Sequence, residues 1–181
     1  MILAVKTRQK YLKELGFYNG KIDGVWGPLS KKATLALQKK YFKRSKDIDG
    51  FYGNDTDILL RNAILVKRNC RYFKLEEFRC ECNSKCTGYP KVLNKKLLII
   101  LDDLRKYFEI PITITCGERC KPYNDSLVGS IPNSQHLYGK AADIYIPGIP
   151  LVNIKKKAYD LGAAYCYYGT PNMGNAVHIN V

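Results

Sequence analysis

The chain has 181 residues, of which 30 are lysine or arginine and 16 are aspartate or glutamate, giving a formal net charge of +14. This length allows one domain or two small ones, each able to bury a core. No apolar run approaches the roughly 18 residues of a membrane-spanning helix, so we expect no transmembrane segment. The N-terminus also lacks the pattern of a signal peptide.

The positive charge indicates a polyanionic partner, such as nucleic acid, anionic lipid or the teichoic acids of a bacterial wall. The alternative is a well-solvated surface without such a partner. No arginine-rich tract or nucleic-acid-binding motif occurs, so we expect no nucleic acid to bind.

A short phrase repeats within residues 1–66. An Asp-Gly pair, followed by a second glycine three residues on, occurs at 23–24 and again at 49–50. Such phrases are typical of tight turns, because glycine tolerates positive φ and aspartate caps nearby amides. Apolar residues at helical spacing follow each turn, and a further helix begins at Val5 and is ended by Gly16. We therefore predict three short helices around one small core.

This first third resembles the peptidoglycan-binding-domain-1 family at nearly every signature position. The matching residues are Val5, Gln9, Leu12, Leu15-Gly16-Phe17-Tyr18, Ile22-Asp23-Gly24, Gly27-Pro28, Ala33 and Leu37-Gln38. The resemblance implies a three-helix module whose partner is peptidoglycan. We expect a ligand groove to use exposed aromatic faces that stack on sugar rings, namely Tyr18, Trp26 and Tyr52. The alternative is that these residues only build the fold.

The second half alternates between helical and strand patterns. Residues 67–75 are polar with little periodicity, which predicts a linker before a domain at 76–181. Apolar spacing predicts helices at 92–108 and 152–161, and alternation predicts strands at 111–115, 141–146, 165–168 and 176–181. The chain is thus expected to be a small three-helix bundle followed by an α+β domain with a mostly antiparallel sheet.

All seven cysteines lie in this half, at Cys70, Cys80, Cys82, Cys86, Cys116, Cys120 and Cys166. The cluster at 80–86 suits disulfides in an oxidising compartment, or a structural metal shared with Cys116 or Cys120. Its spacing is not the Cys-x-x-Cys pairing of common zinc modules. The odd total leaves at least one thiol unpaired within the chain, and both alternatives stay open.

The chain has two histidines, His136 and His178, and Asp143 follows the first by seven residues. Two imidazoles and one carboxylate are a typical ligand set of a catalytic zinc ion, because they leave its fourth tetrahedral position open for water. The alternative is that both histidines are hydrogen-bonded residues of the core or surface. The pattern predicts a zinc hydrolase.

The phrases around these residues resemble the peptidase M15 family of zinc D,D-carboxypeptidases and L-alanyl-D-glutamate endopeptidases, which includes phage endolysins. The matching phrases are Asn133-Ser134-Gln135-His136-x-x-Gly139-x-Ala141-x-Asp143, Thr115-Cys116-Gly117-Glu118-Arg119-Cys120 and Ala176-Val177-His178. The resemblance runs from about residue 73 to 181. It implies that His136, Asp143 and His178 bind Zn²⁺, that Arg119 stabilises the oxyanion and that Ser134 hydrogen-bonds the substrate. The alternatives are a surface ion pair of Arg119 with Glu118 and, for Ser134, a place in a turn or a helix cap.

One departure from the family concerns the general base. Some branches place an acidic residue three before the last histidine and others place one two after it, where this chain has Asn175 and Asn180. An amide cannot accept the proton, so Glu118, Asp125 or the carboxylate of Val181 would have to substitute.

We therefore expect a monomeric cell-wall lytic zinc peptidase, made in the cytoplasm and released to act on peptidoglycan and its anionic polymers. The alternatives are a catalytically weakened, zinc-binding wall protein and a nucleic-acid-binding protein.

Overall fold

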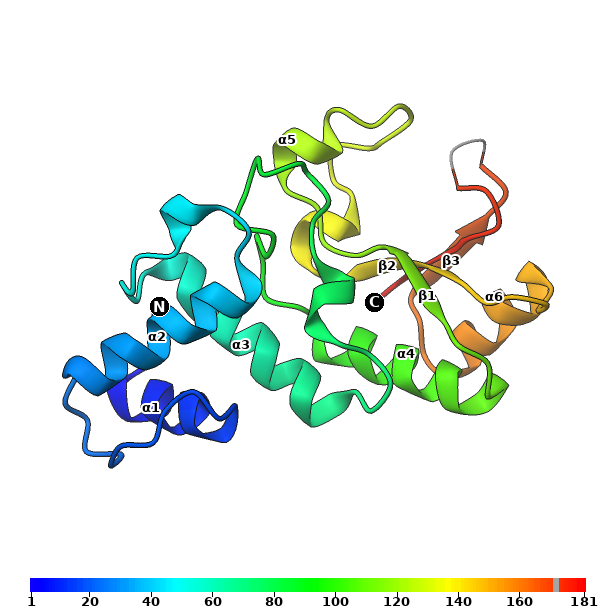
Figure 1. Ribbon diagram of the computed structural model, residues 1–181. Coiled ribbons are helices and arrows are strands. Elements are labelled where there is room, and N and C mark those ends of the chain that lie inside the picture. The colour runs from blue at the N-terminus through cyan, green and yellow to red at the C-terminus, as the bar shows by residue number, and fades with distance from the viewer. Residues whose placement is uncertain (171–172) are drawn as a thin grey trace.

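The computed structural model describes residues 1–170 and 173–181 (Figure 1). Its first part consists of the helices α1 (Val5–Glu14), α2 (Pro28–Tyr41) and α3 (Asn54–Asn69). Proline suits the first position of α2, because the N–H it lacks would have no partner inside the helix. Leu12, Leu37 and Leu59 are fully buried between the helices. The three helices predicted within residues 1–66 are confirmed.

A buried glutamine holds the first of the two Asp-Gly turns. Gln9 Nε2 donates to Asp23 Oδ1 at 2.8 Å and to Val25 O at 2.9 Å, and Gln9 Oε1 accepts from Gly24 N at 2.9 Å. Gly24 has a φ of +87°, a left-handed conformation that a residue with a side chain rarely adopts.

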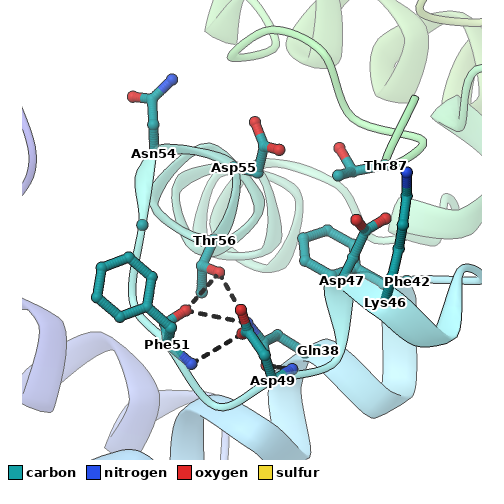
Figure 2. Close-up of a pocket in the computed structure, with 11 residues that line it drawn as sticks. Gln38, Phe42, Lys46, Asp47, Asp49, Phe51, Asn54, Asp55, Thr56 and Thr87 are labelled. Atoms are coloured by element: carbon teal, nitrogen blue, oxygen red, sulfur yellow. Dashed lines mark hydrogen bonds between the residues drawn. The ribbon is translucent and has the colours of Figure 1, made fainter.

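The second turn repeats this arrangement. Gln38 Nε2 donates to Asp49 Oδ1 at 2.9 Å and to Phe51 O at 3.0 Å (Figure 2). Gln38 Oε1 accepts from Gly50 N at 2.7 Å. Both glutamines are almost fully buried, so these bonds replace those that water would make. The repeated phrase in the sequence therefore corresponds to a repeated unit, a helix whose glutamine closes the turn that follows.

Helix α3 belongs to both parts of the molecule. Its buried Asn62 donates to Lys91 O at 2.8 Å and to Glu118 Oε1 at 3.0 Å, and accepts from Leu93 N at 2.8 Å. A single apolar cluster continues from the first helices into the sheet. The helix also runs to Asn69, so the first three residues of the segment predicted as a linker are helical.

The second part contains a four-stranded antiparallel sheet in the order β1-β2-β4-β3. Its strands are β1 (Thr113–Cys116), β2 (Ala141–Tyr145), β3 (Tyr165–Tyr168) and β4 (Val177–Asn180). Helix α6 (Leu151–Asp160) packs on β3 and β4 and also contacts α4 (Lys95–Phe108), which in turn contacts α3. The short helix α5 (Lys121–Asn124) and three 3₁₀-helices, η1 (Ser45–Asp47), η2 (Leu75–Phe78) and η3 (Gln135–Tyr138), complete the described elements. The α+β fold with an antiparallel sheet is confirmed.

Most predicted boundaries lie within a few residues of those observed, and the strand at 165–168 agrees at both ends. The helix predicted at 92–108 begins only at Lys95, because Asn94 Oδ1 accepts from Lys96 N at 2.8 Å and caps it there. Across residues 1–170 and 173–181, no helix combines the length and apolarity needed to span a bilayer.

Candidate metal centre

Two neighbouring strands place an aspartate beside a histidine. In the pairing of β2 with β4, Asp143 lies directly opposite His178, so both side chains leave the same face of the sheet. On β2, Ala142 and Ile144 are fully buried in the apolar core, and alternation sends Asp143 to the other face. Strand β3 adds Tyr167, whose ring stacks on the His178 imidazole with 4.6 Å between centroids.

His136 reaches the same place from the 3₁₀-helix η3, which immediately precedes β2. Gly139 ends this helix with a φ of +65° and turns the chain into the strand. A Cβ at that position would lie 2.6 Å from Val92 O, so a side chain there would displace the backbone. The left-handed glycine thus directs the His136 ring over the sheet.

The three predicted ligands converge. His178 Nδ1 lies 2.7 Å from Asp143 Oδ1, His136 Nε2 lies 3.2 Å from His178 Nδ1, and His136 Nε2 lies 3.3 Å from Asp143 Oδ1. Ligands bound tetrahedrally to zinc at about 2.0–2.1 Å would lie about 3.3 Å apart. The donor atoms and their spacing therefore fit a zinc ion, and all three residues are buried.

The backbone selects the tautomer of His136. Its Nδ1 donates to Gly117 O at 2.6 Å, which leaves Nε2 as the nitrogen directed toward Asp143 and His178. Gly117 is itself enclosed, because a Cβ there would lie 2.5 Å from Phe78 O. Glu118 N also donates to Phe78 O at 2.9 Å, which fixes the turn after β1 against the segment after η2.

The cluster is electrostatically suited to a cation. Burial tends to raise the pKa of Asp143, but hydrogen bonds and charge from His136 and His178 outweigh it and hold the pKa well below its usual value. Burial tends to lower the pKa of His136, but Asp143 and Cys116 raise it to about 9. Burial lowers the pKa of His178. The aspartate therefore remains ionised between the two imidazoles.

Arg119 lies at the edge of this cluster. Its Nη2 donates to Asp143 Oδ2 at 3.1 Å, and its Nε donates to Cys116 Sγ at 3.0 Å. The alternative ion pair with Glu118 is not formed. Glu118 instead accepts from Lys91 N at 2.9 Å and from Asn62 on α3. Burial raises the pKa of Glu118 well above its usual value, although these two donors act to lower it.

Asp125, Asn175 and Asn180 do not supply a base at this cluster either. Asp125 is exposed and pairs with Lys121 at 2.6 Å. Asn175 is exposed ahead of β4, and Asn180 lies on the same face of that strand as His178. The backbone N–H of Val181 donates to Lys140 O. None of these side chains is a carboxylate hydrogen-bonded to the three converging ligands.

Ser134 lies immediately before η3 and is buried, but its side chain makes no capping hydrogen bond to that helix. The structure therefore gives no support to the capping alternative.

Two residues of this cluster were missed by the sequence argument. Cys116 has its Sγ within 4.8 Å of ligand atoms of both His136 and Asp143. Tyr167 stacks on His178, and burial together with the charge of Asp143 raises its pKa. The alternation of the strand at 165–168 was a usable signal for Tyr167, because it places Tyr167 on the face of the sheet opposite to the buried Cys166.

The aromatic residues of the first part are less exposed than predicted. The prediction is wrong for Tyr18, which is buried with its hydroxyl donating to Lys21 O at 2.7 Å. Tyr52 is also buried, and its hydroxyl donates to Asp57 Oδ1 at 3.0 Å. The cause is the same in both cases, because a tyrosine with an internal acceptor can pack its ring in the core. Trp26 is half-buried and lies edge-on to Tyr52 at 5.2 Å.

Two surface hollows adjoin the second turn. One, of about 400 Å³, is lined by Trp26, Tyr52, the exposed Phe51 and Arg8, whose guanidinium lies 4.4 Å from the Tyr52 ring centroid. The other, of about 240 Å³, has a polar lining that includes Asp47, Asp49, Asp55 and Thr87 (Figure 2). The first offers aromatic faces and a cation, and the second offers a mixed lining with three carboxylates.

Comparison with protein families gives two matches to this chain. The family model described as peptidase M15 matches residues 71–180. A family model for a peptidoglycan binding domain matches residues 3–56. Among curated proteins, no sequence matches the chain. The first match contains all three converging ligands, and the second contains both glutamine-held turns.

Proposed function

Because this chain belongs to the peptidase M15 family and has a peptidoglycan-binding module ahead of its peptidase domain, we propose that it is a zinc metallopeptidase that hydrolyses a peptide bond in the peptidoglycan stem, in the manner of an endolysin. The convergence of His136 Nε2, Asp143 Oδ1 and His178 Nδ1 within 3.3 Å of one another carries this proposal. A buried carboxylate between two imidazoles is costly unless a cation or proton compensates it.

The chain's own residues have distinct roles in this proposal. A zinc ion held by the three ligands would supply Lewis acidity at the amide carbonyl and lower the pKa of water. Gly117 O keeps His136 in the ligating tautomer. Arg119 would donate to the carbonyl oxygen as negative charge develops, an interaction whose loss typically costs about 3 kcal/mol. Ser134 would hydrogen-bond the substrate near the scissile bond.

Wall binding would bring the substrate to this site. In the hollow that Trp26, Phe51 and Tyr52 line, Phe51 and the half-buried Trp26 offer aromatic surface on which sugar rings can stack, in place of the predicted contributions of the buried Tyr18 and Tyr52. The net charge of +14 favours a wall rich in anionic polymers. Binding through this module raises the local concentration of stem peptides at the catalytic residues.

One observation favours a second candidate function. Asn175 and Asn180 replace the acidic residues of the family, and Glu118 and Asp125 make their hydrogen bonds elsewhere. A zinc-binding wall protein with weakened turnover accounts for this equally well, because rapid hydrolysis requires a group that moves the proton.

Mass spectrometry of muropeptides released from purified walls tests the proposal and identifies the bond. The zinc-loaded protein is expected to release peptides, a chelator to stop the release, and added zinc to restore it. His136→Ala should be inactive, whereas Lys121→Ala, which removes an exposed ion pair, should remain active. Bound zinc and wall binding without any released peptide would favour the second candidate.

A further inference from the structure

A second group of potential metal ligands lies apart from the His136–Asp143–His178 centre. Cys80, Cys82 and Cys86 come from the loop after η2, and Cys120 immediately precedes α5. Their four Sγ atoms all lie within 4.8 Å of one another. Three of the four are buried, Cys86 is half-buried, and no disulfide occurs among the described residues. The cysteines whose use the sequence left open therefore form one cluster.

The size of the cluster suits a single tetrahedral ion. Zinc binds thiolates at about 2.3 Å, so four sulfurs around it lie about 3.8 Å apart. The Cys82 and Cys86 sulfurs are already 3.4 Å apart. An iron–sulfur cluster places several iron and sulfide ions between its thiolates and needs a wider cage.

Backbone amides are directed at three of these sulfurs. Cys86 N donates to Cys82 Sγ at 3.2 Å, Gly88 N donates to Cys86 Sγ at 3.3 Å, and Cys120 N donates to Cys80 Sγ at 3.2 Å. An amide that donates to sulfur stabilises the thiolate more than the thiol. The thiolate is the form that binds a metal.

The loop between Cys82 and Cys86 adopts a costly conformation. Asn83 and Ser84 are consecutive residues with φ of +48° and +66°, although neither is glycine. Left-handed residues of this kind persist only where their surroundings hold them. A metal bound by the cysteines at both ends of this loop would provide that constraint. Arg44 Nη1 donates to Ser84 O at 3.3 Å, so a positive charge lies beside this loop of potential thiolate ligands.

We propose that Cys80, Cys82, Cys86 and Cys120 bind one structural zinc ion as thiolates, with their protons released to solvent. Cys120 follows Arg119 directly in the chain, and Cys80 lies two residues after Phe78. The carbonyl of Phe78 accepts a hydrogen bond from Glu118 N, so the two segments are already in contact. The ion would therefore fasten the turn that carries Arg119 to the loop at 79–88. This site does not depend on the proposed peptidase activity.

The first measurement is zinc content of the full chain, purified under reducing conditions. We expect two zinc ions per chain, one in a variant combining His136→Ala with His178→Ala, and one in a variant combining Cys80→Ser with Cys120→Ser. Cys70→Ser, which removes a half-buried cysteine outside the cluster, is the matched control and should keep two. If only the histidine-centred proposal is wrong, the unaltered chain should contain one zinc ion. The histidine variant should then keep that ion and the cysteine variant should lose it.

The second measurement uses the unaltered cysteines and so does not depend on the folding of a cysteine variant. Cobalt bound to the His136→Ala, His178→Ala protein should show the intense sulfur-to-metal charge-transfer absorption of a four-thiolate site. Four thiols should resist a thiol reagent until a chelator is added. The proposal would be overturned if the protein bound no metal and its cluster thiols reacted freely. It would also be overturned if the chain mass showed two disulfides, or if the protein contained iron in place of zinc.

Discussion

Gly117 shows how much one missing side chain can determine. A Cβ there would lie 2.5 Å from Phe78 O and 2.6 Å from Phe78 Cα, while the carbonyl of Gly117 orients His136. Gly117→Ala is expected to destabilise the fold by about 1–3 kcal/mol through overpacking and to weaken zinc binding. Denaturant unfolding and zinc titration measure both effects. Gly27→Ala is the control, because a Cβ at Gly27 meets nothing within 4 Å. An unchanged unfolding midpoint for Gly117→Ala would contradict this account.

Arg119 contacts two partners at once, Asp143 and Cys116. Arg119→Ala is expected to lower kcat roughly 100-fold while zinc content is retained, because in the proposed mechanism the guanidinium would act on developing charge rather than on the metal. Arg119→Lys should recover only part of the rate, since an ammonium group cannot reproduce the planar fork. Steady-state kinetics and metal analysis of each variant check this. Loss of zinc from Arg119→Ala would assign the residue to metal binding instead.

At the scale of elements, α3 connects the wall-binding helices to the peptidase domain. Asn62 makes three hydrogen bonds from a fully buried position on this helix, and two of the three partner residues, Leu93 and Glu118, are themselves buried. Asn62→Ala is expected to lower the free energy of unfolding by about 2–4 kcal/mol, because it leaves buried polar groups without partners. Chemical denaturation measures the change. Asn153→Ala, at an exposed position of α6, should have little effect, and equal losses for both variants would refute this role for Asn62.

At the scale of the whole molecule, the shared core predicts cooperative unfolding. One apolar cluster includes residues of α1, α2 and α3 as well as the sheet, so neither part can lose its packing alone. Calorimetry is expected to show a single unfolding transition in which both parts lose their structure together. Two separate transitions would show that the parts are independent domains joined by a linker.

The sequence predicted what depends on local pattern. Helical spacing placed the helices, and the phrases around the two histidines identified residues that the fold brings together, Asp143 and His178 by the antiparallel register and His136 from η3. It did not predict that Tyr18 would be buried, because an amphipathic ring fits the core or the surface according to whether an acceptor is nearby. The orientation of Glu118 could not be predicted from the sequence either, because its partners Asn62 and Lys91 are distant in the chain.

The cysteines illustrate the same limit. The spacing of Cys80, Cys82 and Cys86 admitted disulfides or a metal, and the fourth ligand was open between Cys116 and Cys120. Long-range packing of the turn after β1 against the loop after η2 is what selects Cys120 and leaves Cys116 beside Arg119. No property of the local sequence contains that information.

The continuity of α3 across the two parts has a consequence for how such an enzyme works on a polymer mesh. A hydrolase joined to its binding module by a flexible linker can reach every bond within the linker's length of the bound module. If the proposed wall-binding and catalytic sites are correct, α3 would fix the distance and angle between the bound wall and the bond that is cut. Susceptibility to cleavage would then follow the local spacing of the mesh, so a stretched wall and a relaxed wall of identical chemistry would be cut at different rates.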